Sequence, residues 1–222
     1  MSHSDQKRNR KSLLLYAALA ALVVAGILVA RGMKNDGVTS PGAAFEIRSD
    51  DWVKGNPKAA VRLIEYSDFQ CPACGSYYPL VKELAEEYGD RVAFVYRHFP
   101  LATIHRNAFS AAIAAEAAGR QGDFWGMHDT LFEKQAAWGE SSNPEELFAG
   151  YAADLDLDAE RFRTDSVDSS LRTRVERDAR EADALALNST PTFFLNGVNI
   201  ANPRSLEEFK TQIEAALASA PL

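Results

Sequence analysis

The chain has 222 residues, of which 46% are hydrophobic, 10% aromatic and 25% charged. These proportions are typical of a folded globular protein and argue against disorder of the whole chain. The net charge of −7 argues against a nucleic-acid-binding protein, because such proteins normally present a basic face. We therefore expect no nucleic acid among the partners.

The first 30 residues combine a basic leader with an uncharged apolar run. Residues 1–12 hold four lysine or arginine side chains, and the 18 residues from Leu13 to Ala30 carry no charge. As a helix this run would span roughly 27 Å, close to the hydrocarbon thickness of a bilayer. The pattern predicts a single-pass anchor over 13–30 in the cell membrane, with 1–12 in the cytoplasm and the remaining chain extracytoplasmic.

A cleaved signal peptide is the alternative, and it would leave a secreted or periplasmic protein. The apolar part of such peptides is usually shorter, about 7–15 residues. Cleavage after Ala30 would also place the bulky Leu28 at a position that prefers a small side chain. Under both interpretations, the chain that follows the apolar run is exported. Residues 31–44 are small and polar and contain Pro and Gly, which predicts a flexible linker to a folded domain over 45–222.

The domain opens with a strand–helix–strand pattern. Ala59–Tyr66 is typical of a buried strand, the segment after FQCPAC has apolar residues at helical spacing, and Arg91–Tyr96 is typical of a second strand. Both cysteines lie where the first strand gives way to the helix. This order predicts a βαβ unit.

From about 103 to 187 the pattern is helical, which predicts an all-helical insertion in an α/β domain. Within it we expect Asn143 to cap a helix that begins at Pro144, and the charged run Arg172–Glu181 to be a solvated helix face. An apolar stripe is expected to form the core of the insertion: Phe124, Trp125, Met127, Leu131 and Phe132.

The α/β pattern resumes near the C-terminus. Phe193–Leu195 and Val198–Ala201 are predicted strands joined by an Asn196-Gly197 turn. Ser205 is predicted to cap the last helix, with Glu208 at the capping-box position.

Two cysteines, Cys71 and Cys74, lie three positions apart. A structural disulfide normally joins distant segments, because closing a longer loop constrains the unfolded chain more. A zinc site needs four ligands, and no second cysteine pair or histidine pair at ligand spacing lies beside this one. We therefore expect a redox-active dithiol–disulfide pair with no metal and no separate cofactor.

The position of Cys71 at the first turn of a helix explains how its thiol would be activated. Unpaired backbone N–H groups and the positive end of the helix dipole point at the sulfur, which lowers the thiol pKa below the ordinary value of about 8.5. Pro72 suits this turn because it has no N–H to leave unpaired. Cys74, one turn deeper, is expected to be shielded and to attack the mixed disulfide.

Four segments resemble the DsbA-like branch of the thioredoxin superfamily: EYSDFQCPAC (65–74), VYRHFPL (95–101), the NAFSAAIAAEAA to QGDFWGMHDTLF stretch, and STPTFFLNG (189–197). The resemblance covers about 45–220, including the insertion. It implies an α/β thioredoxin fold, with a central mixed sheet flanked by helices. It also implies a disulfide oxidase that acts on exported cysteine-containing proteins and is re-oxidised by a quinone-linked membrane oxidase.

The resemblance assigns substrate contacts to Pro72 and Ala73, between the cysteines, and to Thr190 and Pro191. Thr190-Pro191 matches the family's cis-proline loop, where a cis bond exposes backbone to a substrate segment that pairs with it as an added strand.

Glu65 matches a buried acid beneath the cysteine pair, with a pKa raised by burial, that accepts the proton of Cys74. A solvent-facing carboxylate at the strand end is the alternative. Asp68 is expected in the loop as a cap. His98 and His105 are expected to be packing or surface residues.

The direction of the reaction stays open at this point. Ala73 stands where the best-known oxidants of the family have a histidine, so one donor to the thiolate is absent and we expect a milder oxidant. An envelope reductase or isomerase is therefore a second hypothesis. A non-catalytic peptide-binding chaperone or adaptor is a third.

Overall fold

The computed structural model describes residues 45–220. The predicted leader (1–12), anchor (13–30) and linker (31–44) lie outside the described residues. Within 45–220, no helix combines the length and the apolar character needed to cross a bilayer.

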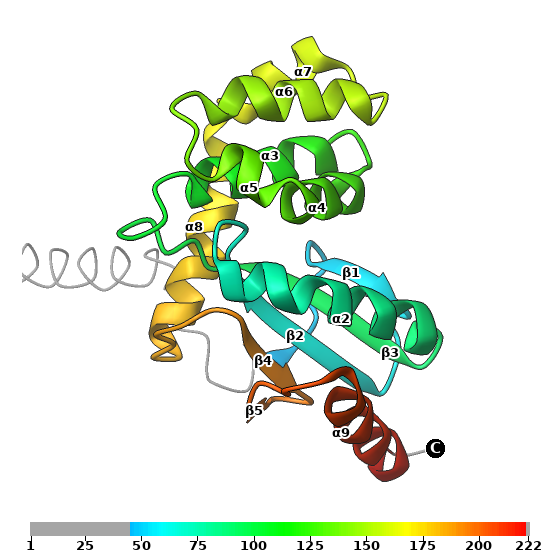
Figure 1. Ribbon diagram of the computed structural model, residues 1–222. Coiled ribbons are helices and arrows are strands. Elements are labelled where there is room, and N and C mark those ends of the chain that lie inside the picture. The colour runs from blue at the N-terminus through cyan, green and yellow to red at the C-terminus, as the bar shows by residue number, and fades with distance from the viewer. Residues whose placement is uncertain (1–44, 221–222) are drawn as a thin grey trace, which may run out of the picture. The chain divides into compact units, whose positions relative to one another are not determined.

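A five-stranded mixed sheet forms the centre of the domain (Figure 1). The strands are β1 (Trp52–Gly55), β2 (Val61–Ser67), β3 (Val92–His98), β4 (Thr192–Leu195) and β5 (Val198–Ile200). Their spatial order is β1–β3–β2–β4–β5, with β2 and β3 parallel and the other neighbours antiparallel.

Helices cover both faces of this sheet. On one face, Leu63 and Phe94 pack against α2 (Pro72–Tyr88) and α9 (Leu206–Ser219). On the other face, Ile64 and Val95 pack against α8 (Ser169–Ala184). Because β2 and β3 are covered on both sides, their sequences are nearly continuous apolar runs. The predicted βαβ unit is confirmed as β2–α2–β3.

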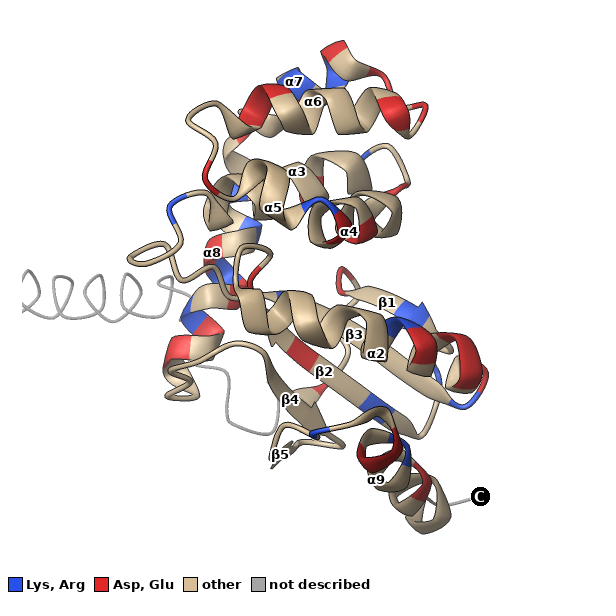
Figure 2. Cartoon of the chain, viewed as in Figure 1, with Lys and Arg blue, Asp and Glu red and all other residues tan. Residues whose placement is uncertain are grey.

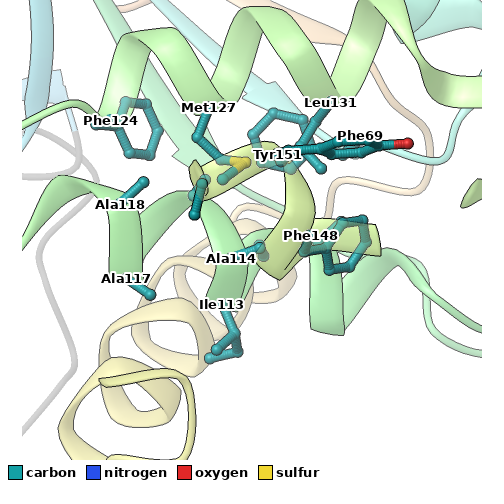
Figure 3. Packing of buried hydrophobic residues seen from close by; sticks show 14 of the residues in the cluster. Phe69, Ile113, Ala114, Ala117, Ala118, Phe124, Met127, Leu131, Phe148 and Tyr151 are labelled. Carbon is teal, nitrogen blue, oxygen red and sulfur yellow. The ribbon is translucent and has the colours of Figure 1, made fainter. Parts of the chain in front are cut away.

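The segment between β3 and β4 is helical. Before α8 it contains α3 (Ala108–Gly119), α4 (Phe124–Glu133), α5 (Gln135–Trp138), α6 (Pro144–Asp154) and α7 (Ala159–Ser166). Helix α3 lies at the centre of this group and is buried along most of its length, which explains its alanine-rich sequence. Figure 3 shows its alanines among the larger side chains of Phe124, Met127 and Leu131, which belong to the predicted core stripe. Trp125, in the same stripe, is partly buried at its edge.

The predicted strands differ from the observed ones by at most two residues at either end. Strand β1 was not expected from the sequence, because it is an edge strand of mixed polarity with only intermediate burial. The Asn196-Gly197 turn is confirmed, since both residues have positive φ (49° and 82°) and the turn joins β4 to β5.

Both predicted cap residues are at the N-cap positions of their helices, and one of the two side chains makes a cap hydrogen bond. The Ser205 hydroxyl accepts a hydrogen bond from the Glu208 backbone N–H at 3.2 Å, as a capping box requires. Asn143 is the N-cap residue of α6 and Pro144 begins the helix, as predicted, but the Asn143 side chain makes no cap hydrogen bond.

The charged run Arg172–Glu181 does not form a simple solvated face. Figure 2 shows acidic and basic residues alternating along α8, which packs on the sheet. Asp178 and Glu181 are buried, and Glu181 pairs with the buried Arg97 of β3 at 3.0 Å. The sequence pattern misled because charges at helical spacing look the same whether they face solvent or a buried partner.

Candidate active site

Cys71 is the N-cap residue of α2, directly after the loop that leaves β2. Its backbone is extended (φ −68°, ψ 122°), and Pro72 follows in the first turn, as predicted. Cys71 keeps 7% of its surface exposed and Cys74 keeps 0%, while Pro72 and Ala73 are exposed around them. Cys71 is therefore the cysteine that another protein can reach.

The two thiols differ sharply in acidity. The Cys74 thiol lowers the pKa of Cys71 to about 5, against partial burial, with help from Thr190 and from the backbone N–H groups of Cys74 and Ala73. Burial raises the pKa of Cys74 well above its ordinary value, and the charges of Cys71 and Glu65 raise it further. The helix-start effect predicted from the sequence is present, and the neighbouring Cys74 thiol is a larger cause of the low pKa of Cys71.

The Thr190-Pro191 peptide bond is cis, as the family resemblance implied. The backbone carbonyl of Thr190 lies 3.4 Å from the Cys71 sulfur and accepts a hydrogen bond from its thiol. This contact brings the start of β4 to the cysteine pair across a sequence separation of 119 residues.

Glu65 lies on β2 and is buried beneath the cysteine pair, which excludes the solvent-facing alternative. Burial raises its pKa to about 7, and the Ser67 hydroxyl opposes that rise. At neutral pH the carboxyl group can therefore both give and take a proton.

A cavity of about 30 Å³ adjoins Glu65 beneath α2. This volume is enough for a buried water molecule. Its walls include Lys54, Lys82 and Asp129, and Asp129 pairs with Lys82 at 3.1 Å. The cavity therefore connects the buried carboxyl group with a charged part of the surface.

Side chains of the helical insertion hold the loop that carries Cys71. Gln135 Nε2 donates hydrogen bonds to the carbonyl oxygens of Phe69 (2.7 Å) and Cys71 (3.0 Å). Gln70 Nε2 donates to the carbonyl of Gly139 at 2.7 Å. These glutamines were missed because a glutamine in a helical segment gives no sequence signal of what it will contact.

Asp68 lies in the loop, as expected, but it does not cap α2. Its carboxylate accepts hydrogen bonds from the backbone N–H groups of Gln70 (2.7 Å) and Leu101 (2.8 Å), and it pairs with His105 at 2.7 Å. His98 is buried and pairs with Glu116 at 2.9 Å. Both histidines therefore have structural contacts, in agreement with their predicted packing role.

A family model described as Thioredoxin matches residues 48–215. Among curated proteins, Na(+)/H(+) antiporter NhaA 3 of Salinispora tropica is 42% identical over 172 residues, and NhaA 1 of Mycolicibacterium gilvum is 40% identical over 169 residues. These matches cover 78% and 74% of this chain. The chain spans about a quarter of the length of these relatives, since 26% of each is matched.

Solved structures of similar fold agree with the match to the Thioredoxin family model. Wolbachia pipientis alpha-DsbA1 superposes with a TM-score of 0.72 at 21% identity, covering 81% of this chain and 97% of that one. BdbD from Bacillus subtilis superposes with a TM-score of 0.65 at 25% identity, covering 75% of this chain and 92% of that one. The chain therefore belongs to the thioredoxin family and has the DsbA type of thioredoxin fold.

Proposed function

We propose that this protein is a thiol–disulfide oxidoreductase that introduces disulfide bonds into exported proteins through Cys71 and Cys74. The observation that carries the proposal is the contrast between an accessible, acidic Cys71 thiol and a sealed, protonated Cys74 thiol. Stabilising the Cys71 thiolate stabilises the dithiol form, which makes the disulfide form a stronger oxidant.

The proposed reaction transfers two electrons from a client dithiol to the Cys71–Cys74 disulfide. A client thiolate attacks the Cys71 sulfur, so the Cys71–Cys74 bond breaks and a mixed disulfide forms. Cys74 leaves as a thiolate and takes a proton from the Glu65 carboxyl group. A second client thiolate then attacks the client sulfur of the mixed disulfide, and Cys71 leaves readily because its thiol pKa is low.

We further propose that the client segment lies across the exposed Pro72 and Ala73 and beside the Thr190-Pro191 loop. A backbone strand of the client would pair with Thr190, while its cysteine reaches the Cys71 sulfur. The position of the Thr190 carbonyl, 3.4 Å from that sulfur, supports this path.

Location and re-oxidation complete the proposal. The domain would act on the extracytoplasmic side of the cell membrane, tethered by residues 13–30 or released there after signal cleavage, and a quinone-linked membrane oxidase would restore the disulfide. No separate cofactor is needed, because the cysteine pair itself holds the two electrons. Ion transport is not part of the proposal, because the chain matches about a quarter of the antiporter relatives.

A reductase or isomerase would use the same pair in the opposite direction. Ala73, which gives the thiolate no imidazole donor, is the observation that favours this second candidate. Equilibrium of the full chain against a glutathione series separates the two. A reduction potential of about −120 to −180 mV supports the oxidase, and one of about −270 mV supports the reductase.

The chaperone hypothesis is tested by Cys71→Ser. In a purified system, the disulfide form of the wild-type protein is expected to oxidise a reduced unfolded client, whereas Cys71→Ser transfers no disulfide. Cys74→Ser is expected to accumulate a mixed disulfide between Cys71 and the client. Unchanged activity of Cys71→Ser would overturn the enzymatic proposal in favour of simple peptide binding.

A further inference from the structure

Two buried hydroxyl groups lie beneath the cysteine pair without ordinary hydrogen bonds. Ser67 is 1% exposed and Tyr96 is 3% exposed. Neither hydroxyl meets hydrogen-bond geometry with any residue in the described range 45–220. Leaving a buried polar group unsatisfied costs about 1–3 kcal/mol, so two such groups at one place call for a physical reason.

Both hydroxyl groups are on the sheet face that Glu65 shares. Ser67 follows Glu65 by two residues on β2, and alternate residues of a strand point to the same face. Tyr96 is directly opposite Glu65 in the parallel β2–β3 pairing. Cys74, on α2, belongs to the same packed cluster as Tyr96. The carboxyl group, the two hydroxyl groups and the buried thiol therefore form one group of neighbours.

Strand alternation places Ser67 on the same face as Glu65, at the end of β2 that leads to the cysteine loop. Burial raises the pKa of Glu65 to about 7 and raises those of Cys74 and Tyr96 well above their ordinary values. In each case the Ser67 hydroxyl opposes the rise. A serine hydroxyl can donate and accept at once, which is what a proton relay requires.

The cavity beneath α2 reaches Glu65 but does not reach Cys74, so a proton path between these two residues needs another group. Glu65 and Tyr96 line the cavity, but Cys74 and Ser67 do not. Water in the cavity can therefore exchange protons with Glu65 and cannot touch the Cys74 sulfur directly.

We propose that the Ser67 hydroxyl relays a proton between the Glu65 carboxyl group and the Cys74 sulfur; this inference rests on the proposed function. When the Cys71–Cys74 bond breaks, Cys74 leaves as a thiolate. Ser67 gives its hydroxyl proton to that sulfur and takes the proton of Glu65, so the serine is restored and Glu65 ends as a carboxylate. In re-oxidation the same protons move in reverse. The cavity then returns Glu65 to equilibrium with solvent.

Single-turnover kinetics test the relay. The full chain in its disulfide form is mixed with a reduced dithiol peptide between pH 5.5 and 8.5, and the first-order loss of the Cys71–Cys74 bond is followed. Ser67→Ala is expected to slow this step at least about tenfold at pH 7, since a positioned proton-transfer group typically contributes about 10²–10⁴-fold and water can replace part of the relay. Its pH profile is expected to move to higher pH, because Glu65 loses the hydroxyl group that lowers its pKa.

The control variant is Ser219→Ala, which removes an exposed hydroxyl from α9 and is expected to leave the rate and its pH profile unchanged. Thermal unfolding excludes a trivial loss of structure, because removing an unsatisfied buried hydroxyl is expected to leave the Tm of Ser67→Ala equal or higher.

A double variant decides whether Ser67 and Glu65 act in one path. Ser67→Ala combined with Glu65→Gln is expected to be no slower than Glu65→Gln alone, because the relay has nothing to carry once the acid is gone. If the slowdown of the double variant equals the product of the two single-variant slowdowns, the two residues act independently and the relay is overturned. An unchanged rate and pH profile in Ser67→Ala would also overturn it. A wild-type protein that transfers no disulfide at all would instead overturn the proposed function, so the two failures are distinguishable.

Discussion

Gln135, on the four-residue helix α5, donates a hydrogen bond of 3.0 Å from Nε2 to the carbonyl oxygen of Cys71. The same nitrogen donates to the carbonyl of Phe69 at 2.7 Å. Because Cys71 is the N-cap of α2, its carbonyl and sulfur are placed by the same short loop. The helical insertion therefore fixes the reactive cysteine from outside the strand–helix unit that contains it.

Gln135→Ala is expected to weaken this placement. Losing two hydrogen bonds to backbone carbonyls should lower the free energy of unfolding by about 1–3 kcal/mol and slow disulfide transfer several-fold. Denaturant unfolding and single-turnover transfer measure the two effects. Lys134→Ala, a truncation of the neighbouring exposed residue, is the control. Equal behaviour of the two variants would contradict a positioning role for Gln135.

The stability of the dithiol form is expected to depend on pH through Cys71. Its folded pKa of about 5 lies below the ordinary value of about 8.5, so ionisation stabilises the folded dithiol form fully above about pH 8.5, and this stabilisation is lost as the pH falls through 5. Between pH 5 and pH 7 the free energy of unfolding of the dithiol form should rise by roughly 2–3 kcal/mol relative to that of the disulfide form.

Urea unfolding of both redox forms at the two pH values measures this gain. Groups that titrate equally in the two forms cancel in the comparison. Cys71→Ser, which forms no disulfide and has no thiol at this position, is expected to gain about 2–3 kcal/mol less free energy of unfolding between pH 5 and pH 7 than the wild-type dithiol form. A difference between the redox forms that does not change from pH 5 to pH 7 would contradict an ionised Cys71.

Much of the core architecture could be predicted because it depends on local patterns. The apolar runs that became β2 and β3, the cysteine at the start of α2 and the Asn196-Gly197 turn each carry a signal within a few residues. The cis bond at Pro191 was accessible only through family resemblance, because proline alone does not indicate it.

The remaining features depend on contacts between distant residues. Gln135 and Cys71 are 64 positions apart, and Arg97 and Glu181 are 84 positions apart. A buried carboxylate has the same sequence signature as a solvated one, so the charged run on α8 was predicted to face solvent. Ser67 was missed for a similar reason, since a serine at the end of a strand gives no sign that its hydroxyl is buried among titrating groups.

Glu65→Gln is expected to stabilise the protein at alkaline pH. The folded pKa of Glu65 is raised to about 7 from 4.5, so its favourable contribution is fully present below pH 4.5 and is lost as the pH rises through 7. The ionised carboxylate therefore costs roughly 3 kcal/mol at pH 8, and a neutral amide of the same shape avoids much of that cost.

Urea unfolding at pH 4 and pH 8 is the measurement. The free energy of unfolding of Glu65→Gln should equal that of the wild-type protein at pH 4 and exceed it by roughly 2–3 kcal/mol at pH 8. Glu86→Gln, at an exposed position on α2, serves as the control and should change neither value. A wild-type protein as stable as Glu65→Gln at pH 8 would show that the buried carboxyl group titrates normally.

Arg97→Leu is expected to be strongly destabilising. Arg97 is 0% exposed in its side chain and pairs with Asp51 at 2.8 Å and with Glu181 at 3.0 Å. Removing the guanidinium group takes the fully buried partner from two buried carboxylates, which then keep, within the described part of the chain, only the partly exposed Arg48 as an ion-pair partner. Breaking a buried ion pair in this way typically costs about 3–5 kcal/mol. Arg180→Leu removes an arginine of α8 whose side chain is 65% exposed, and this control should change stability by less than about 1 kcal/mol. Equal losses of unfolding free energy in the two variants would support a solvated charged face on α8. The expected difference would show that the buried charges of α8 belong to the core that joins the insertion to the sheet.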